Sequence, residues 1–401
     1  MTCVIVHKVS TKPTAEIIAI GSELLSGYII DTNSSHISRV LASSGIEICF
    51  ISAVGDDEEV IADAIRRALS RADIVLTTGG LGPTIDDKTR AAVSLATDRS
   101  LIFEEILFQQ IESRFSHWGR KMSDNNVRQA YMPDGALPIE NPVGTAPCFV
   151  VEHDGSHVIS LPGVPREMKY LLDHEVMPYL DRIFPANDVI KTRVLHTAGV
   201  GESVVDAKIG HLESMENPVV GLAAHQGIVD IRITATGSSD KEADKLINNV
   251  EEEARGHLGD VIFGVDGQSL ASVVLEQLEK SGHTVSVVES GTSGELASKL
   301  VVADKARGVF GMGLLCGNFV SGGDIETNLK DMMKSRPTDL DSSFIIASSV
   351  YVNENSIEIG VALYRSDNKS ITTKTRGFGG HIDYAGEWAA NVGLDLLRDC
   401  V

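Results

Sequence analysis

Residues 72–90 read ADIVLTTGGLGPTIDDKTR, and this stretch determines how the rest of the chain is interpreted. Residues 74–78 form a strand-like run that leads into a glycine turn at 79–84, and Asp86 and Asp87 follow where a helix can begin. In an open α/β sheet, ligands bind at the carboxyl ends of the strands. Glycines let the backbone approach a phosphate and present N–H groups to it, and paired carboxylates can hold a divalent cation. The alternative is an ordinary turn in which Asp86 only caps the helix.

The length and charge of the chain limit the possible functions. A chain of 401 residues exceeds the size of one ordinary core, so two or three domains are expected. The formal net charge of −21 disfavours nucleic acid as a partner, because phosphate backbones require clustered Lys and Arg. An acidic protein that binds a nucleotide would need a metal ion and backbone N–H groups to attract the phosphates. The charge therefore argues against nucleic acid, and a nucleotide-like small molecule would bind only where this acidic field is locally reversed.

Cysteine usage and hydropathy predict a cytoplasmic protein without a membrane partner. The five cysteines are far apart in the sequence and show no CxxC spacing, which is typical of free thiols in a reducing compartment. No apolar run approaches the roughly 18 residues that a membrane helix requires. Residues 1–14 contain only a short apolar run and no cleavage-site pattern, so we expect a flexible extension there.

Strand and helix patterns alternate in the first half of the chain. Strand patterns at residues 15–21, 46–54 and 74–78 are separated by helical patterns, which indicates parallel pairing through right-handed crossovers. A hairpin is expected for residues 148–152 and 157–161, around Asp154-Gly155. The predicted fold class is α/β, with a doubly wound, mostly parallel sheet in residues 15–185. A small α+β domain should occupy residues 186–264, and an α/β layered domain residues 265–401.

Polar residues follow the expected strand ends in the first domain. Parallel strands share one edge at their carboxyl ends, so residues scattered in the sequence should converge there on one crevice. The residues at these ends are Glu23, Asp31, Asn33, Asp56, Asp57, Asp86, Asp87, Thr89 and Arg90, of which Asp56 and Asp57 taken alone would be solvated or capping acids. Asp31 could equally cap the following helix. Asn141, Gly144 and Gly163 lie in loops of the same domain, where Asn141 could donate hydrogen bonds to a base or ribose.

Other possible sites find little support in the sequence. We expect surface or core positions, not metal ligation, for six histidines without paired ligand spacing: His36, His117, His153, His157, His174 and His196. Ser290 lacks the GxSxG pattern of a hydrolase nucleophile.

Five motifs in series resemble the competence/damage-inducible CinA family. They are GSELLSG (21–27), DTN (31–33), TTGGLGPTIDDKT (77–89), NPVGTAP (141–147) and LPGVPREM (161–168). The resemblance implies a molybdopterin-binding-like first domain and a KH-like middle domain. The middle domain lacks the GxxG clamp of RNA-binding KH domains, which indicates a dimerisation or spacer role. Asp86 stands where the molybdenum-cofactor proteins carry arginine, and Cys148 stands where the family usually has glycine.

The resemblance also implies an activity and a set of roles. The family's first domain is associated with metal-dependent hydrolysis of ADP-ribose to AMP and ribose 5-phosphate. Asp86, Asp87 and Thr89 would be catalytic, and Asp86 and Asp87 would hold a divalent metal ion or orient water. Gly79, Gly80, Gly82, Pro83 and Thr84 would form the phosphate cradle. Asp31, Asn33 and Asn141 would contact the sugar or base, and Glu23, Arg90, Gly144 and Gly163 would complete the substrate site. A homodimer is implied as well.

The last domain resembles the family's nicotinamide-mononucleotide deamidase domain only in outline. Residues 289–294 read ESGTSG in place of the family's ESCTGG, and residues 307–313, where the family carries its serine, contain none. The family's Tyr-Ser-Asn is replaced near Ser321-Gly322-Gly323, and its Thr-Gly-x-Ala-Gly-Pro turn is absent from residues 346–355. We expect deamidase activity to be lost. The main alternative to hydrolysis is a non-hydrolytic nucleotide-binding or scaffold protein; deamidation and molybdopterin binding rank lower.

Overall fold

The chain forms two compact units, residues 1–190 and 191–401. The structure is a computed structural model that describes residues 12–185, 188–305, 307–317, 324–334, 340–352 and 356–401. The first strand already begins at Thr14, the last residue of the expected extension, and residues 1–11 lie outside the described part. The second unit contains two separate sheets, and its division at residue 264 stays a prediction.

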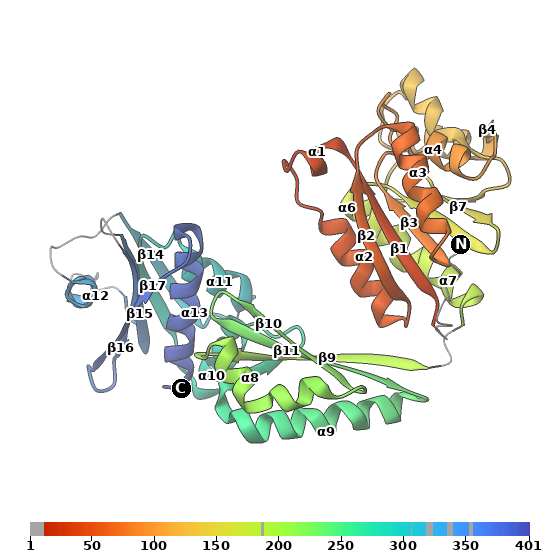
Figure 1. Cartoon of the computed structure of the whole chain (residues 1–401). Helices are drawn as coiled ribbons and strands as arrows, with labels where there is room; N and C mark the ends of the chain where they lie inside the picture. The colour runs from red at the N-terminus through yellow and green to blue at the C-terminus, as the bar shows by residue number, and fades with distance from the viewer. Residues whose placement is uncertain (1–11, 186–187, 306, 318–323, 335–339, 353–355) are drawn as a thin grey trace. The chain divides into compact units, whose positions relative to one another are not determined.

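A six-stranded sheet forms the centre of the first unit, in the order β2-β1-β3-β8-β7-β6 (Figure 1). Strands β1, β2, β3 and β8 are parallel, and β7 pairs antiparallel with both β8 and β6. The strands are β1 (Thr14–Ile20), β2 (Glu47–Val54), β3 (Ile74–Thr78), β6 (Leu137–Ile139), β7 (Cys148–His153) and β8 (Ser156–Leu161). The predicted doubly wound, mostly parallel α/β fold and the predicted hairpin are confirmed.

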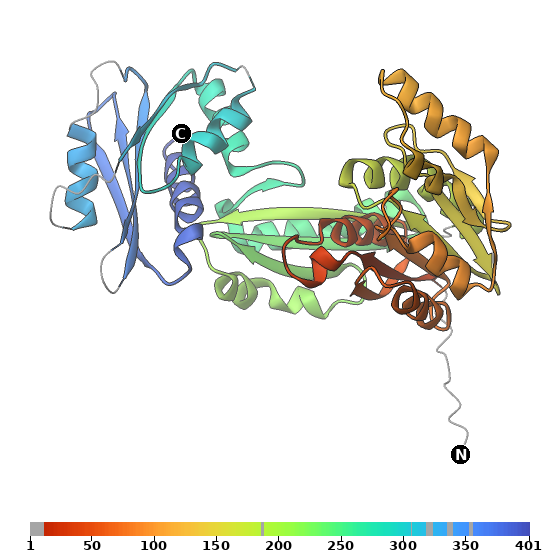
Figure 2. The ribbon, with the colours of Figure 1, turned by 90° about the horizontal axis from the view of Figure 1, so that it is seen from above.

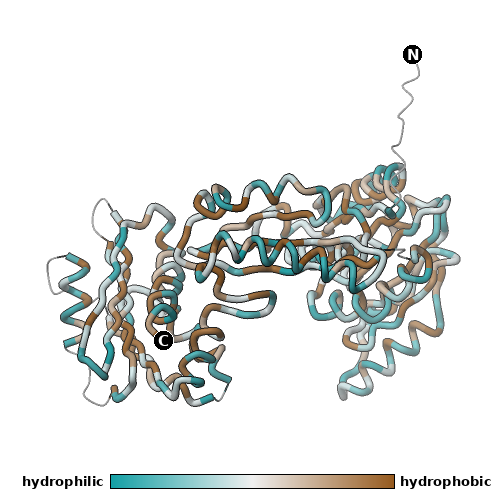
Figure 3. The backbone as a smooth tube through the Cα atoms, turned by 90° about the horizontal axis from the view of Figure 1, so that it is seen from below, coloured by the Kyte–Doolittle hydropathy of each residue, from teal (hydrophilic) through white to brown (hydrophobic). Residues whose placement is uncertain are grey.

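Helices cover both faces of this sheet. One face packs against α3 (Glu58–Leu69), α4 (Thr89–Ala96) and α5 (Glu105–His117), and the other against α2 (Thr32–Ser43), α6 (Pro165–Leu171) and α7 (Met177–Ile183). The strands carry mostly apolar segments, whereas the helices alternate between apolar and polar residues (Figure 3). This alternation lets each helix bury one side against the sheet.

Local sequence explains where α3 begins and ends. The Asp57 carboxylate caps the helix by accepting the Val60 N–H at 3.0 Å, and acidic residues occupy the first turn. Arg66 and Arg67 lie in the last turn, where a positive charge favours the helix dipole. Its buried residues, among them Ile61 and Ile65, follow the helical repeat.

Short elements complete the first unit. They are α1 (Ser22–Leu25), β4 (Leu101–Phe103), β5 (Tyr131–Pro133), the 3-10 helix η1 (Asp124–Ala130) and the π-helical turn η2 (Leu172–Val176). β4 and β5 pair as a separate antiparallel ribbon. The 3-10 form of η1 is a tighter helix that is common in short connecting segments.

The second unit begins with a four-stranded sheet in the order β10-β11-β9-β12. Its strands are β9 (Val189–Ala198), β10 (Val219–His225), β11 (Ile228–Gly237) and β12 (Ile262–Val265). The helices of this part are α8 (Glu202–Ile209), the 3-10 helices η3 (Gly210–Ser214) and η4 (Gly259–Val261), and α9 (Asp240–Leu258).

A five-stranded sheet follows, in the order β14-β13-β15-β16-β17. The strands are β13 (Val285–Ser290), β14 (Phe310–Cys316), β15 (Phe344–Val352), β16 (Ile357–Arg365) and β17 (Ile371–Phe378). One face packs on α10 (Leu270–Ser281), α11 (Glu295–Asp304) and α13 (Ala385–Arg398), which follows the 3-10 helix η5 (Ile382–Tyr384). The opposite face packs on α12 (Ile325–Lys334), as Figure 2 shows.

Candidate functional site

The ends of β1, β3 and β8 meet at one edge of the first sheet. From β1 the chain proceeds to β2 on one side and then to β3 on the other, so the topological switch point lies between β1 and β3. The backbones approach very closely here. A Cβ on Gly79 would lie 2.1 Å from the Ile20 carbonyl oxygen, and a Cβ on Gly163 would lie 3.2 Å from the Gly79 Cα. Glycine at 79, with φ +110°, is therefore required by both conformation and space.

Asp87 holds the glycine loop in shape. Its Oδ1 accepts the Gly82 N–H at 2.7 Å, and its Oδ2 accepts both the N–H (2.7 Å) and the hydroxyl (2.6 Å) of Thr84. A carboxylate that accepts three such bonds fixes the backbone of the loop. The structure thus gives Asp87 a bracing role within the predicted phosphate cradle.

Thr89 and Arg90 connect the loop to the next helix. The buried Thr89 hydroxyl donates to the Gly79 carbonyl at 2.7 Å, and the Arg90 guanidinium donates to the carbonyls of Leu81 and Gly82, each at 2.7 Å. Burial lowers the pKa of Arg90 to about 10. Both side chains bind the protein's own loop. Thr89, predicted to be catalytic, and Arg90, predicted to bind substrate, would therefore act only by keeping the loop in shape.

Asp86 differs from its neighbour. The helix α4 begins at Thr89 after Lys88, which makes no side-chain capping bond, so the alternative in which Asp86 caps this helix is wrong. Asp86 is exposed, and the nearby Thr84 hydroxyl holds the pKa of its carboxyl below the usual range. An exposed and ionised carboxylate at the loop remains available to a cation or to water.

A pocket of about 300 Å³ opens beside the loop. Thr84, Asp87 and Arg90 of the predicted set line it. The sequence analysis did not single out the rest of its wall, which includes four polar residues: Glu58, Lys88, Arg128 and Tyr131. Arg128 and Tyr131 come from η1 and β5, about forty residues after the loop, and no motif in the sequence connects them to it. Together with Arg90, Lys88 and Arg128 outnumber the two acids of the wall, Glu58 and Asp87, and a net positive charge favours a phosphorylated ligand.

Asn33 joins three segments of the chain at the same edge. Its Nδ2 donates to the Thr78 hydroxyl at 3.1 Å and to the Gly163 carbonyl at 2.8 Å. Its Oδ1 is buried and accepts no hydrogen bond from any residue that the structure describes. A buried acceptor without a partner is rare and indicates a place where a ligand or water donates.

The other predicted residues at strand ends have clear local roles. The Asp31 side chain accepts the Ser34 N–H at 2.9 Å, so it caps α2, as its alternative interpretation predicts. The exposed Glu23 lies on α1 beside the β1 end, since a Cβ on Gly21 would be 2.6 Å from its Oε1. Pro83, next to Thr84, is half-buried within the braced loop.

Asn141 and Gly144 surround a glutamate that the sequence analysis did not single out. Asn141 Nδ2 donates to the Ala146 carbonyl and to Glu167 Oε2, at 3.0 and 2.6 Å. A Cβ on Gly144 would lie 2.0 Å from the Glu167 carboxylate. Both amide hydrogens of Asn141 are used inside the protein, so the expected donation to a sugar or base would require breaking one of these bonds. Burial raises the pKa of Glu167.

One group in the described residues combines side chains of metal-binding type at ligand spacing. His211, Glu253 and His257 in the second unit offer ligand atoms that all lie within 4.8 Å of one another. Two imidazoles and a carboxylate are a donor set that zinc and iron use. Glu253 and His257 are four residues apart on α9, but the sequence alone does not connect them to His211 on η3. Asp86 and Asp87 are not part of this group.

Comparisons with known proteins agree with this architecture. Residues 16–182 match the family described as "Probable molybdopterin binding domain", and residues 192–264 match "Damage-inducible protein CinA KH domain". A putative competence-damage inducible protein of Halothermothrix orenii is 41% identical over 286 residues, which cover 71% of this chain and 69% of the relative. One from Clostridium botulinum is 41% identical over 297 residues, 74% of this chain and 72% of the relative.

Two solved structures are similar to part of this chain. The CinA protein of unknown function from Thermoplasma acidophilum is 35% identical, with a TM-score of 0.40 over 42% of this chain and 99% of that one. A molybdopterin biosynthesis enzyme, MoaB, from Thermus thermophilus is 19% identical, with a TM-score of 0.31 over 43% of this chain.

Fold and domain matches thus define a protein with a molybdopterin-binding-like domain followed by a KH domain. The chain belongs to the competence-damage inducible (CinA) family. Within the described ranges, every helix is too short or too polar to cross a bilayer.

Proposed function

We propose that the first unit hydrolyses ADP-ribose, or a related nucleotide diphosphate, to AMP and ribose 5-phosphate. The observation that carries this proposal is the braced glycine loop at the switch point. The N–H groups of Gly80 and Leu81 make no hydrogen bond with the residues that the structure describes, while Asp87 and Thr89 fix the loop around them. Consecutive free N–H groups on a rigid glycine loop are suited to the oxygens of a diphosphate.

The side chains around the loop support the same reaction class. Lys88 and Arg128 in the wall of the adjoining pocket would balance the charge of the diphosphate. Hydrolysis breaks one P–O bond of the diphosphate bridge, and water supplies the oxygen for the new phosphate. Fixed donors at the loop would stabilise the negative charge that develops on the phosphoryl oxygens. The unpartnered Asn33 Oδ1 could accept a hydrogen bond from a substrate hydroxyl.

Of the two adjacent carboxylates at the loop, one is available to hold a divalent cation. Magnesium is commonly held by one or two carboxylates together with substrate phosphates. Asp86 would hold the ion, because its carboxylate is exposed, whereas both Asp87 oxygens already bind the loop. When bound, the ion would neutralise charge on the diphosphate.

One observation favours the rival proposal, binding without hydrolysis. The structure uses Asp87 for bracing, so only Asp86 of the paired acids is left for catalysis. A loop that is shaped for phosphate but carries one available carboxylate would bind a nucleotide and fail to activate water. Molybdopterin binding, which the name of the matched domain suggests, ranks lower because fold likeness alone does not determine the ligand.

The test is incubation of the full chain with ADP-ribose and Mg²⁺ or Mn²⁺, with AMP measured by chromatography. We expect AMP that disappears with chelator and in Asp86→Asn. Asp154→Asn is the matched control, because Asp154 lies in an exposed hairpin turn and its substitution should leave turnover unchanged. If no AMP forms with either metal while ADP-ribose still raises the melting temperature, the binding proposal holds. If neither effect occurs, both proposals are wrong.

A further inference from the structure

The second unit contains a pocket of about 540 Å³ that the proposed hydrolysis does not use. Its walls come from β9, the β10–β11 turn region, β12, and the helices α10, α11 and α13. Figure 1 shows these three helices near the ends of β10 and β11, and the Asn391 amide on α13 donates to the Gln226 carbonyl in the β10–β11 turn. The volume is within the range of small-molecule sites.

The charge of this pocket is opposite to that of the whole chain. The protein carries 56 acidic and 35 basic residues, yet no acidic residue is among the eighteen described residues that line the pocket. Three of them are cations, Lys299, Lys305 and Arg307. A local reversal of charge on an acidic protein attracts an anionic ligand.

The three basic side chains differ in whether they form ion pairs. Lys299 lies 3.0 Å from the Glu387 carboxylate, and Arg307 lies 3.6 Å from that of Glu279. Lys305 has no ion pair or hydrogen bond with the residues that the structure describes. Its φ of +40° ends α11 in the left-handed region, an unusual conformation for lysine. Lys305 is therefore the cation that is free to meet a ligand.

The amino end of α10 contributes donors to the same pocket. Ser269 and Ser272 form a capping box, in which each side chain accepts the other residue's N–H. The N–H groups of Leu270 and Ala271 keep no partner among the described residues, and both residues line the pocket. The start of a twelve-residue helix with two free N–H groups favours an anion such as phosphate.

The rest of the wall suits an organic body. Phe263, Val302 and Leu394 provide apolar surface. The His196 ring stacks on Phe263 at 5.7 Å and is held by Asp230 and by the Asp266 carbonyl, each at 2.7 Å. Asn391 is only 5% exposed, and its Oδ1 has no hydrogen bond with the described residues. An amide oxygen in the wall can accept a hydrogen bond from a ligand that carries a donor.

From this arrangement we propose a second ligand site for a phosphate monoester of nucleotide size. The phosphate would bind the α10 amino end and Lys305, and the organic body would lie against Phe263 and Val302. Asn391 would accept a hydrogen bond from a hydroxyl or amino group of that body. The site belongs to the second unit and does not depend on hydrolysis in the first.

AMP is the probe, and amide hydrogen exchange of the full chain is the measurement, because exchange separates the two units. We expect AMP to slow exchange in peptides that cover residues 267–275 and 298–305. Lys305→Glu should raise the AMP concentration needed for the same slowing by about tenfold or more. Val302→Trp should also weaken it, since Val302 is 71% exposed and a larger side chain there fills the pocket without disturbing the core.

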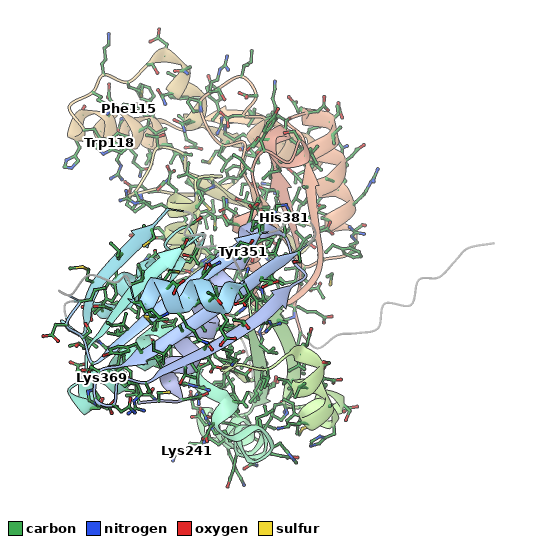
Figure 4. The ribbon with its side chains drawn as sticks, turned by 90° about the vertical axis from the view of Figure 1, so that its left-hand side faces the viewer. Phe115, Trp118, Lys241, Tyr351, Lys369 and His381 are labelled. Atoms are coloured by element: carbon green, nitrogen blue, oxygen red, sulfur yellow. The ribbon has the colours of Figure 1, made fainter. Side chains whose placement is uncertain are left out.

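Lys241→Glu is the matched control. Lys241 lies at the surface of α9 (Figure 4), and no ion pair or hydrogen bond to it occurs in the described residues. This variant should respond to AMP like the natural sequence. If AMP leaves the exchange of residues 267–275 unchanged, or if Lys305→Glu and Lys241→Glu behave alike, the proposal is wrong. Protection of residues 77–90 and release of AMP from ADP-ribose report on the first unit separately.

Discussion

The Asp87 carboxylate and the backbone of Gly82 form one structural unit. Asp87 Oδ1 accepts the Gly82 N–H at 2.7 Å, and a Cβ on residue 82 would lie 2.5 Å from Oδ2. The third glycine of the motif is needed so that the aspartate can approach, and the aspartate is needed to hold the glycine. Asp87 therefore has a structural role in the loop, which is distinct from the catalytic role proposed for Asp86.

Asp87→Asn should damage the loop. An amide can accept only at its oxygen, so its NH₂ group would face either the Gly82 N–H or the two donors of Thr84. We expect the free energy of unfolding of the first unit to fall by about 1–3 kcal/mol. Calorimetric unfolding of the full chain measures this change. Asp86→Asn is the matched variant, and its stability should stay within about 0.5 kcal/mol of the natural sequence. Equal loss in both variants would contradict the bracing role.

Gly79→Ala should destabilise the first unit strongly. The new Cβ would overlap the Ile20 carbonyl oxygen at 2.1 Å, and that atom belongs to the backbone of β1 and cannot move aside. We expect a loss of more than about 3 kcal/mol, because strain and overlap add. Gly155→Ala is the control, since Gly155 also has a positive φ but nothing within 4 Å of a Cβ. It should lose only about 1–2 kcal/mol. Similar melting temperatures for the two variants would refute the steric argument.

Thr89→Val should show how the loop depends on one hydroxyl. Valine keeps the volume but leaves the Gly79 carbonyl without its buried donor, which costs about 1–3 kcal/mol. Thr89→Ser keeps the donor and should restore most of the stability and the ADP-ribose affinity. Thermal unfolding and ligand-induced shifts of the melting temperature check both statements. If serine restores neither, the hydroxyl is not the important group.

The raised pKa of Glu167 should make the stability of the protein depend on pH. Burial raises its pKa in the folded state, so between its ordinary pKa and the raised value the folded chain binds more protons than the unfolded chain. Its contribution to stability therefore falls as pH rises through that window, from about 4.5 upward. Glu167→Gln removes this titration. As pH rises, the urea midpoint of the variant should increase relative to that of the natural sequence. A difference between the two midpoints that does not change with pH would contradict the prediction.

Deamidase activity is expected to be absent. The position of the family's serine within residues 307–313 is occupied in part by β14, which carries Phe310 and Gly311 here. Neither side chain can act as a nucleophile. The replaced Tyr-Ser-Asn near Ser321 and the end of the missing turn at residues 353–355 lie outside the described residues. Incubation of the purified chain with nicotinamide mononucleotide should release no ammonia, and measurable release would overturn the expectation.

Regular periodicity made most of the first unit predictable. β3 occupies the expected residues 74–78, because a continuous apolar run ended by glycines is typical of a buried strand. The hairpin of β7 and β8 followed from Asp154-Gly155, both of which have positive φ values.

Elements of the second unit were harder to find. β17 was missed because it is a mostly exposed edge strand, with polar residues at most positions. α13 contains Gly386 and Gly393, which lower helix propensity. Their use is clear only from the packing, since a Cβ on Gly386 would lie 2.6 Å from the Thr292 carbonyl oxygen.

The location of the candidate site could be predicted from the sequence, but the roles of its individual residues could not. The sequence placed Asn33 and Gly79 at one sheet edge and Gly163 in a loop of the same domain, and the structure brings Gly163 to that edge as well, in contact with both. It could not distinguish Asp86 from Asp87, because two adjacent carboxylates are chemically alike and only the course of the loop decides which one faces its N–H groups.

The Asn33 amide also has a consequence for the order of folding. It joins residues 45 positions apart, Asn33 and Thr78, and residues 130 positions apart, Asn33 and Gly163. Contacts of such long sequence separation form late, because long loops must close first. The complete candidate site should therefore form only after β8 has paired with β3, and a nascent chain that ends before residue 163 would contain the whole glycine motif without this contact.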